Sequence, residues 1–118
     1  MLMKFTLPMC PPLNSLYRYG RRGMYKIAKA RAWETDAIYK IKRVRWDRKP
    51  ITGTIEMWVH LYLKRDRDID GSLKLILDVF EKAGVYENDS QVTVLQVRKQ
   101  MDKKNPHIEI IINLLGGL

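Results

Sequence analysis

The chain has few of the residues that crosslink, export or anchor a protein. Its one cysteine, Cys10, cannot form an internal disulfide. Residues 1–6 lack the apolar run of a signal peptide, and no segment approaches the roughly 20 apolar residues of a membrane span. We therefore expect a cytoplasmic protein without membrane association.

The composition lacks the signature of a disordered chain. Hydrophobic residues make up 46% of the 118 residues, and the 30% that are charged alternate with apolar positions. A chain of this length buries a core without metal or disulfide support. We expect one domain over residues 1–118.

Acidic residues are scarce where cations gather. Residues 1–50 contain 13 Lys and Arg against 3 Asp and Glu, whereas residues 51–118 contain 9 against 10. The formal net charge of +9 therefore lies in the first half of the chain. Such a field favours nucleic acid or an anionic membrane surface, although small basic proteins also carry such charge for solubility.

The hydrophobic periodicity predicts the order strand, helix, strand, helix, strand, strand. Between the first strand and the first helix, prolines and glycines predict an irregular loop. Alternation predicts the strands and three-to-four spacing the helices, and Gly84 is placed as a C-terminal cap. The fold class is α+β (mixed α/β), with a mixed sheet covered by two helices. The predicted strands are 2–7, 55–64, 92–101 and 107–115, and the predicted helices are 25–45 and 71–83.

The second face of the 55–64 strand is not simply polar. Trp58 and Tyr62 lie on it, which predicts cover by a helix or by another subunit. His60 shares this face, and we interpret it as a packed or hydrogen-bonded side chain rather than a catalyst.

Three acids stand at alternate positions, Asp66, Asp68 and Asp70. Carboxylates this close repel one another unless a cation lies among them, and a hard divalent metal is the usual one. If the chain stays extended to Asp70, then Asp68 and Asp70 project to the same side. Asp70 is also a natural N-cap for the second helix. Lys74, four residues later, could pair with a carboxylate or contact a phosphate.

Other interpretations of these acids remain open. Asp70 could only cap the helix while Asp66 and Asp68 are solvated. The segment 66–77 partly matches a calcium-binding EF-hand loop, but Leu77 stands where that loop needs a bidentate Glu. Asp89, in the turn after the second helix, is by itself an ordinary turn residue.

Taken together, these residues resemble the RusA family of Holliday junction resolvases, small nucleases often carried by prophages. The similarity spans nearly the whole chain, and its motifs are matched in order and spacing. They are Thr6-Leu7-Pro8 with Pro11-Pro12 and Asn14, Asp68-Ile69-Asp70 with Lys74, and Lys82-Ala83-Gly84 followed by Asn88-Asp89-Ser90-Gln91-Val92. The chain departs from the family at Gly71 and Ser72, where Asn and Leu are common, and at the extra Cys10, and no family role falls on Asp66.

The resemblance implies a homodimeric endonuclease that cuts four-way junction DNA symmetrically in recombination and repair, with Mg²⁺ or Mn²⁺ as cofactor. It implies that Asp68, Asp70 and Asp89 hold the metal and that Lys74 is the catalytic lysine. A nucleoid-associated location follows if the host is a bacterium. The alternative is a non-catalytic DNA-binding accessory protein. For DNA contact we expect the cations and polar residues of the loop, of the first helix and beside the acids: Asn14, Tyr17, Arg18, Arg21, Arg22, Lys26, Lys29, Arg65 and Arg67.

Overall fold

The structure is a computed structural model, which describes residues 2–11, 17–20, 23–26, 28–45 and 48–116. The side chains of residues 17–20, 23–26, 70 and 71 are not described.

A four-stranded mixed sheet forms the centre of the molecule. Its strands are β1 (Leu2–Pro8), β4 (Thr54–Leu63), β5 (Val92–Met101) and β6 (His107–Gly116), in the order β1-β6-β4-β5. The β1–β6 and β6–β4 pairs are antiparallel and the β4–β5 pair is parallel. A parallel pair requires a crossover, because the chain must return to the end of the sheet at which the first strand began, and the second helix lies in that connection.

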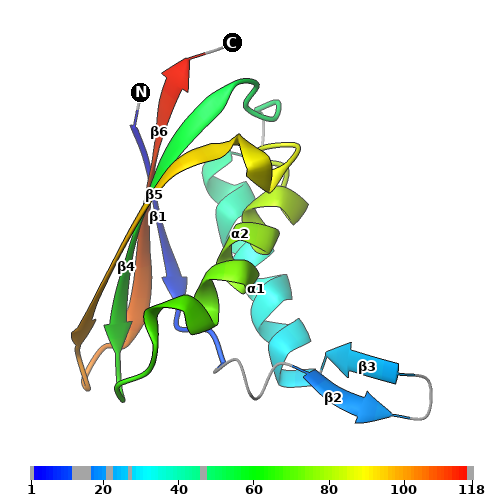
Figure 1. Cartoon of the computed structure of the whole chain (residues 1–118), viewed down its shortest axis with the longest axis vertical. Helices are drawn as coiled ribbons and strands as arrows, with labels where there is room; N and C mark the ends of the chain where they lie inside the picture. The colour runs from blue at the N-terminus through cyan, green and yellow to red at the C-terminus, as the bar shows by residue number, and fades with distance from the viewer. Residues whose placement is uncertain (1, 12–16, 21–22, 27, 46–47, 117–118) are drawn as a thin grey trace.

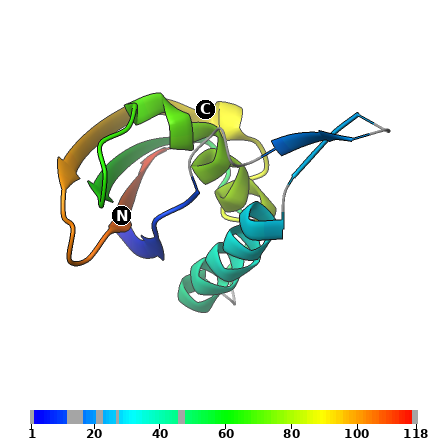
Figure 2. The same cartoon turned by 90° about the horizontal axis from the view of Figure 1, so that it is seen from below.

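Two helices cover one face of the sheet, as Figures 1 and 2 show. They are α1 (Ala28–Arg45) and α2 (Leu73–Lys82), and short 3₁₀ turns lie before and after α2, η2 (Ile69–Ser72) and η3 (Asp89–Gln91). The predicted order of strands and helices and the α+β class are therefore confirmed.

The core lies between the sheet and these helices. Along β4 the alternate residues from Ile55 to Leu63 are at most 2% exposed, and Ile108, Ile110 and Ile112 of β6 are fully buried beside them. Trp33, Ala37 and Ile41 of α1 and Leu75, Ile76, Val79 and Phe80 of α2 cover this face. The period of two in the strands and of 3.6 in the helices thus selects the same buried surface.

The second helix ends as its glycine predicts. Gly84 has a φ of +79°, which glycine adopts without the strain of a side chain. The amide of Val85 donates to the carbonyl of Phe80 and that of Gly84 to Glu81, both at 3.0 Å, which is the Schellman arrangement.

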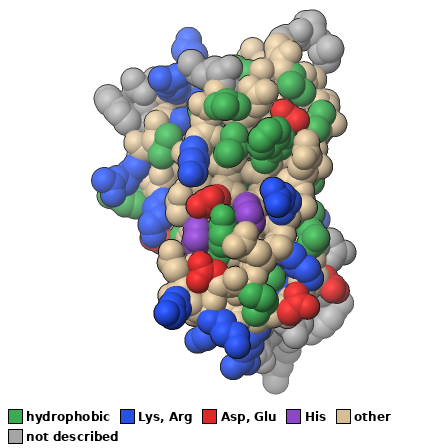
Figure 3. Space-filling view, turned by 90° about the vertical axis from the view of Figure 1, so that its left-hand side faces the viewer, with side chains coloured by type: hydrophobic (Ala, Val, Ile, Leu, Met, Phe, Trp, Pro, Cys, Tyr) green, Lys and Arg blue, Asp and Glu red, His purple; other side chains and the backbone are tan. Residues whose placement is uncertain are grey.

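The opposite sheet face is open in the described chain. Trp58 is 46% exposed there, and the His60, Tyr62 and His107 rings stack with centroid separations of 4.3 and 4.2 Å. Both histidines are visible on this face in Figure 3. The packed interpretation of His60 is confirmed and cover of this face by a helix of the same chain is wrong, whereas cover by another subunit stays a prediction.

The region after the first strand is not an irregular loop throughout. Strands β2 (Tyr17–Gly20) and β3 (Gly23–Lys26) form an antiparallel hairpin that projects from the body of the molecule (Figures 1 and 2). The loop prediction is wrong for these residues, and α1 begins at Ala28 instead of residue 25. None of the helices in the described ranges is long and apolar enough to cross a bilayer.

Candidate functional site

The acidic segment lies directly after β4. The strand ends at Leu63, the chain bends at Lys64 and Arg65, and from Ile69 it winds into the 3₁₀ turn η2. The extended backbone expected as far as Asp70 is therefore absent. Asp70 lies in this 3₁₀ turn, in which residues three apart share a side. The two-residue alternation of a strand therefore does not place Asp68 and Asp70 on the same side.

The predicted N-cap is also displaced by this turn. Ser72, not Asp70, is the N-cap of α2, and its side chain makes no capping hydrogen bond. Asp70 lies within η2, where its backbone is described and its side chain is not. Lys74 is exposed in the first turn of α2, next to this acidic segment.

Two cations hold the segment in place. The guanidinium of Arg67 donates to the carbonyl of Cys10 at 2.9 Å, which ties the segment to the chain just after β1. Lys99 of β5 donates to the Asp66 carboxylate and to the Arg67 carbonyl, both at 2.9 Å. The segment between β4 and η2 is thus fixed from both sides.

Asp66 is bound by a lysine. The hydrogen bond and charge of Lys99 lower the pKa of the Asp66 carboxyl below its ordinary value, although the side chain is 75% exposed. Asp68 is exposed as well. Part of the repulsion expected among the acids is therefore relieved by a cation of the chain itself.

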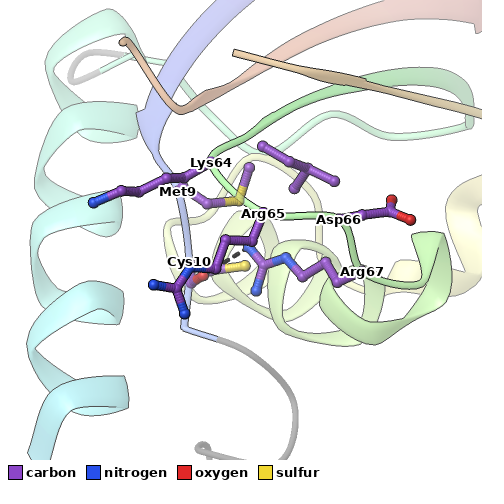
Figure 4. A pocket seen from close by; sticks show the side chains of 7 residues that line it. Met9, Cys10, Lys64, Arg65, Asp66 and Arg67 are labelled. Carbon is purple, nitrogen blue, oxygen red and sulfur yellow. Dashed lines mark hydrogen bonds between the residues drawn. The ribbon is translucent and has the colours of Figure 1, made fainter. Parts of the chain in front are cut away.

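A cavity of about 390 Å³ opens beside this segment (Figure 4). It is lined by Met9, Cys10, Leu63, Lys64, Arg65, Asp66 and Arg67. In Figure 4 the Lys64 and Arg65 side chains point towards α1, whereas Asp66 points the other way. A second cavity of about 300 Å³ shares Met9 and Cys10 and adds Lys29 and Trp33 of α1. The end of β1 is therefore ringed by cations, an arrangement that attracts anions.

Cys10 lines both cavities but is buried. The residue is 3% exposed, and burial raises the pKa of the thiol. At neutral pH the thiol is therefore protonated and serves as a packing group.

Asp89 is placed by the turn that precedes β5. Asn88 accepts from the amide of Ser90 at 2.8 Å, and the Gln91 side chain accepts from the amides of Glu87 and Asn88 at 3.0 and 3.1 Å. The Gln91 amide group also donates to the carbonyls of Ile51 and Gly53, at 2.8 and 2.9 Å. The capping box fixes the Asp89 turn, and the two bonds to Ile51 and Gly53 anchor it to the residues before β4.

The same turn is tied to the end of α2. The amide of Asp89 donates to the Glu81 carboxylate at 2.9 Å, and the buried Tyr86 hydroxyl donates to the carbonyl of Leu77. Burial, together with the negative charges of Asp89, Glu81 and Asp78, raises the pKa of Tyr86. The Asp89 turn therefore lies beside the second half of α2.

The predicted metal ligands thus lie at different ends of one helix. Asp70 comes just before α2, while Asp89 is bonded to its last turn, and the ten residues of α2 span about 15 Å. Among the described side chains, no three of His, Cys, Asp and Glu lie close enough to share a metal. The Asp70 carboxylate falls outside that set, so the three-aspartate site stays a prediction.

The family model described as "Endodeoxyribonuclease RusA" matches residues 8–113 of this chain. The chain belongs to the RusA family. The resemblance found in its motifs is therefore confirmed.

Several relatives support this membership over nearly the full length. Proteins of Escherichia coli strain K12 and of Enterobacteria phage 82, both named crossover junction endodeoxyribonuclease RusA, are each 31% identical over 115 residues. These alignments cover 95% of this chain and 94% of each relative. A protein of the same name from Aquifex aeolicus is 30% identical over 94 residues, covering 79% of this chain and 75% of that protein.

In this RusA family member, the residues expected to contact DNA fall into three groups. Lys29 and Arg65 line the two cavities at the end of β1, and Arg67 is partly buried and bonded to the Cys10 carbonyl. Tyr17, Arg18 and Lys26 belong to the projecting hairpin, where only the backbone is described. Asn14, Arg21 and Arg22 lie outside the described residues.

Sequence reasoning missed three contributors to this region. Lys64 lines the cation-ringed cavity, Lys99 holds the acidic segment, and Gln91 holds the Asp89 turn. Gln91 had a signal, because it follows Asn88 at the spacing of a capping box. Lys99 had none, since it meets Asp66 only through the pairing of β4 with β5.

Proposed function

We propose that this RusA family member is a homodimeric, Mg²⁺-dependent endonuclease that resolves four-way DNA junctions by paired cuts in recombination and repair, acting on DNA in the cytoplasm. One observation carries the proposal. The family match runs from residue 8 to 113, and within it a carboxylate-bearing turn lies directly beside a cation-lined cavity. Cations that hold a phosphate backbone next to acids that hold a metal are what phosphodiester hydrolysis requires.

The donor chemistry of the proposed ligands fits Mg²⁺. Asp68, Asp70 and Asp89 offer carboxylate oxygens, and the Asp68 and Asp89 side chains are exposed to an incoming ion. A bound Mg²⁺, for which Mn²⁺ can substitute, would polarise the scissile phosphate and activate a water for attack. Because α2 separates Asp70 from Asp89 along one chain, we propose that the DNA-bound homodimer is the form in which these carboxylates meet.

Lys74 supplies a positive charge next to the proposed metal ligands. It is exposed in the first turn of α2, where the helix dipole also favours negative charge. We propose that it stabilises the charge that develops on the phosphate in the transition state. Lys29, Lys64 and Arg65 would hold the neighbouring phosphates, and a two-fold symmetric dimer suits paired cuts in a two-fold symmetric junction.

Cleavage of a synthetic four-way junction, beside a linear duplex of the same sequence, tests this function. The wild type should cut the junction in Mg²⁺ and not in chelator. Asp70→Asn should lower the cleavage rate at least about 100-fold, the scale lost with an essential catalytic group. Binding should persist in this variant, because a negative charge facing DNA has been removed. Full cleavage by Asp70→Asn would refute the assignment.

Asp66→Asn is the matched control for this experiment. It removes the same charge from the same segment, but Asp66 is paired with Lys99 at an exposed position. Because exposed ion pairs contribute little, cleavage should stay within about fivefold of the wild type.

Two other functions were considered, a DNA-binding accessory protein and a calcium-binding EF-hand. Binding of the junction without cleavage in Mg²⁺ or Mn²⁺ would identify a DNA-binding accessory protein. The structure excludes an EF-hand, because a strand, β4, leads into the acidic segment where an EF-hand has a helix.

A further inference from the structure

We propose that two copies of this chain pair through the open edge of β5, with the two strands antiparallel about a two-fold axis. The inference rests on the homodimer of the proposed function and locates its interface. Val94 and Leu95 lie next to the axis.

The edge of β5 is long, and its first six residues, 92–97, carry no charge. β5 is the last strand in the sheet order, its ten residues contain no proline, and all its side chains except Val92 and Val97 are exposed. In Figure 2 no described element lies beyond it. Unpaired backbone amides and carbonyls along such an edge are a template for another strand.

Three of the exposed residues of this edge are apolar, and two of them lie in its middle. Val94 and Leu95 are each 38% exposed and Met101 is 47% exposed. Trp58 of the neighbouring strand β4 is also exposed. Monomeric proteins protect edges of this kind with charge, proline or a covering element. The β1 edge has such protection, because α1 packs near it and the Arg45 guanidinium donates to the Met3 sulfur.

The charges at the two ends of β5 are complementary to each other. The exposed acids Glu87 and Asp89 precede the strand, whereas the exposed cations Arg98 and Lys99 lie near its end. An axis between Val94 and Leu95 pairs residues 92–97 of the two strands and brings the η3 turn of one copy opposite residues 98–100 of the other. Asp89 of one copy is then the diagonal neighbour of Arg98 in the other, twice about the axis, which favours antiparallel over parallel pairing.

The middle of the strand argues for a protein partner over nucleic acid. Residues 92–97 carry no cation. A phosphate backbone laid along this edge would meet apolar side chains, whereas a second β5 would bury them and satisfy the backbone groups.

The test is the oligomeric state of the full chain, measured by light scattering and sedimentation without DNA or metal. The wild type should be a dimer. Val94→Lys with Leu95→Lys should weaken self-association by at least about tenfold, because two apolar cross-strand contacts become like-charge repulsions. Far-ultraviolet circular dichroism should be unchanged, since both side chains are exposed.

The control is Leu2→Lys with Leu115→Lys, which makes the same change at exposed apolar residues of β1 and β6. This control should remain dimeric. Val94→Cys or Leu95→Cys should be crosslinked by a short bismaleimide, whereas Leu2→Cys should not, and the native Cys10 is buried.

A monomeric wild type, or a dimer that survives Val94→Lys with Leu95→Lys, would overturn the interface. A dimer lost only on Trp58→Lys would assign the open sheet face instead. A β5-dependent dimer that cuts no junction would contradict only the nuclease, and a monomer that cuts one would contradict only the interface.

Discussion

At the scale of single residues, cations of the chain perform part of the role that the spacing of the acids predicted for a metal ion, which is to neutralise the carboxylates. Arg67 and Lys99 fix the segment that carries Asp66 and Asp68, and Asp66 has a lysine ligand already. Asp68 is left exposed in a segment whose backbone is fixed. Because such preorganisation lowers the entropy lost on binding, the contacts that hold the segment also serve a proposed site.

The Asp66 pair makes a prediction about titration. Asp66 should titrate below its ordinary pKa of 3.8, and Lys99→Met should raise that pKa back towards the ordinary value. Since the folded-state pKa is the lower one, the pair stabilises the fold above pH 3.8, and this contribution disappears as the pH falls through the folded-state pKa. Carboxyl chemical shifts measured by NMR against pH check it. Lys103→Met should leave the Asp66 midpoint unchanged, and an unshifted Asp66 in the wild type would contradict the pairing.

At the scale of elements, the turn before β5 is a fixed part of the fold. The turn contains the three-residue 3₁₀ helix η3. Hydrogen bonds from the Gln91 side chain link it to the residues before β4, and the bond between the Asp89 amide and the Glu81 carboxylate links it to α2. A turn bonded to two different elements holds its backbone in one conformation. Asp89 is therefore presented from a rigid support.

Gln91→Ala should loosen this support. The substitution removes the bonds to Ile51 and Gly53 and leaves their carbonyls without that donor, so the free energy of unfolding should fall by about 2 kcal/mol. Urea denaturation measures this loss. Asn105→Ala, at an exposed position of the loop between β5 and β6, is the control and should change stability by less than about 0.5 kcal/mol. Equal stability of the two variants would show that the turn does not depend on Gln91.

At the scale of the whole molecule, the two halves of the sequence meet at the end of β1. The first half carries the excess of cations, while the acids proposed as ligands come from the second half. The fold brings Lys29 of α1 next to the cavities beside Lys64 and Arg65. A polyanion held by these cations would lie beside the acidic segment.

Lys64→Gln with Arg65→Gln should therefore weaken junction binding and reduce its salt dependence. Each lost phosphate contact lowers the slope of log K against log salt by about 0.9. Fluorescence anisotropy over a range of salt concentrations gives both quantities. Arg48→Gln with Lys49→Gln makes the same charge change at exposed residues before β4, at its other end, and should lower the slope less. Identical slopes for the two variants would mean that only net charge matters.

Much of the fold could be predicted because periodicity reports burial directly. The alternation of β4 and β6 and the spacing in α1 and α2 select the residues that became the core, and Gly84 ends α2 as its position predicts. The β2–β3 hairpin escaped prediction because its strands, Tyr17–Gly20 and Gly23–Lys26, have only four residues each and each includes a glycine. Strands this short leave little periodic signal in a sequence.

For the candidate site, too, the sequence predicts the residues and the tertiary structure decides where they lie. The sequence predicted the residues that we propose for the chemistry, the acids Asp68, Asp70 and Asp89 and the cations near them, since residue type and order suffice to match a family. Only the tertiary structure decided that Asp70 lies in a 3₁₀ turn, that Lys99 holds Asp66, and that Asp89 sits at the far end of α2. Local patterns encode burial and turn type, but contacts between distant segments depend on how strands pair and where helices cross, and residue spacing does not record those distances.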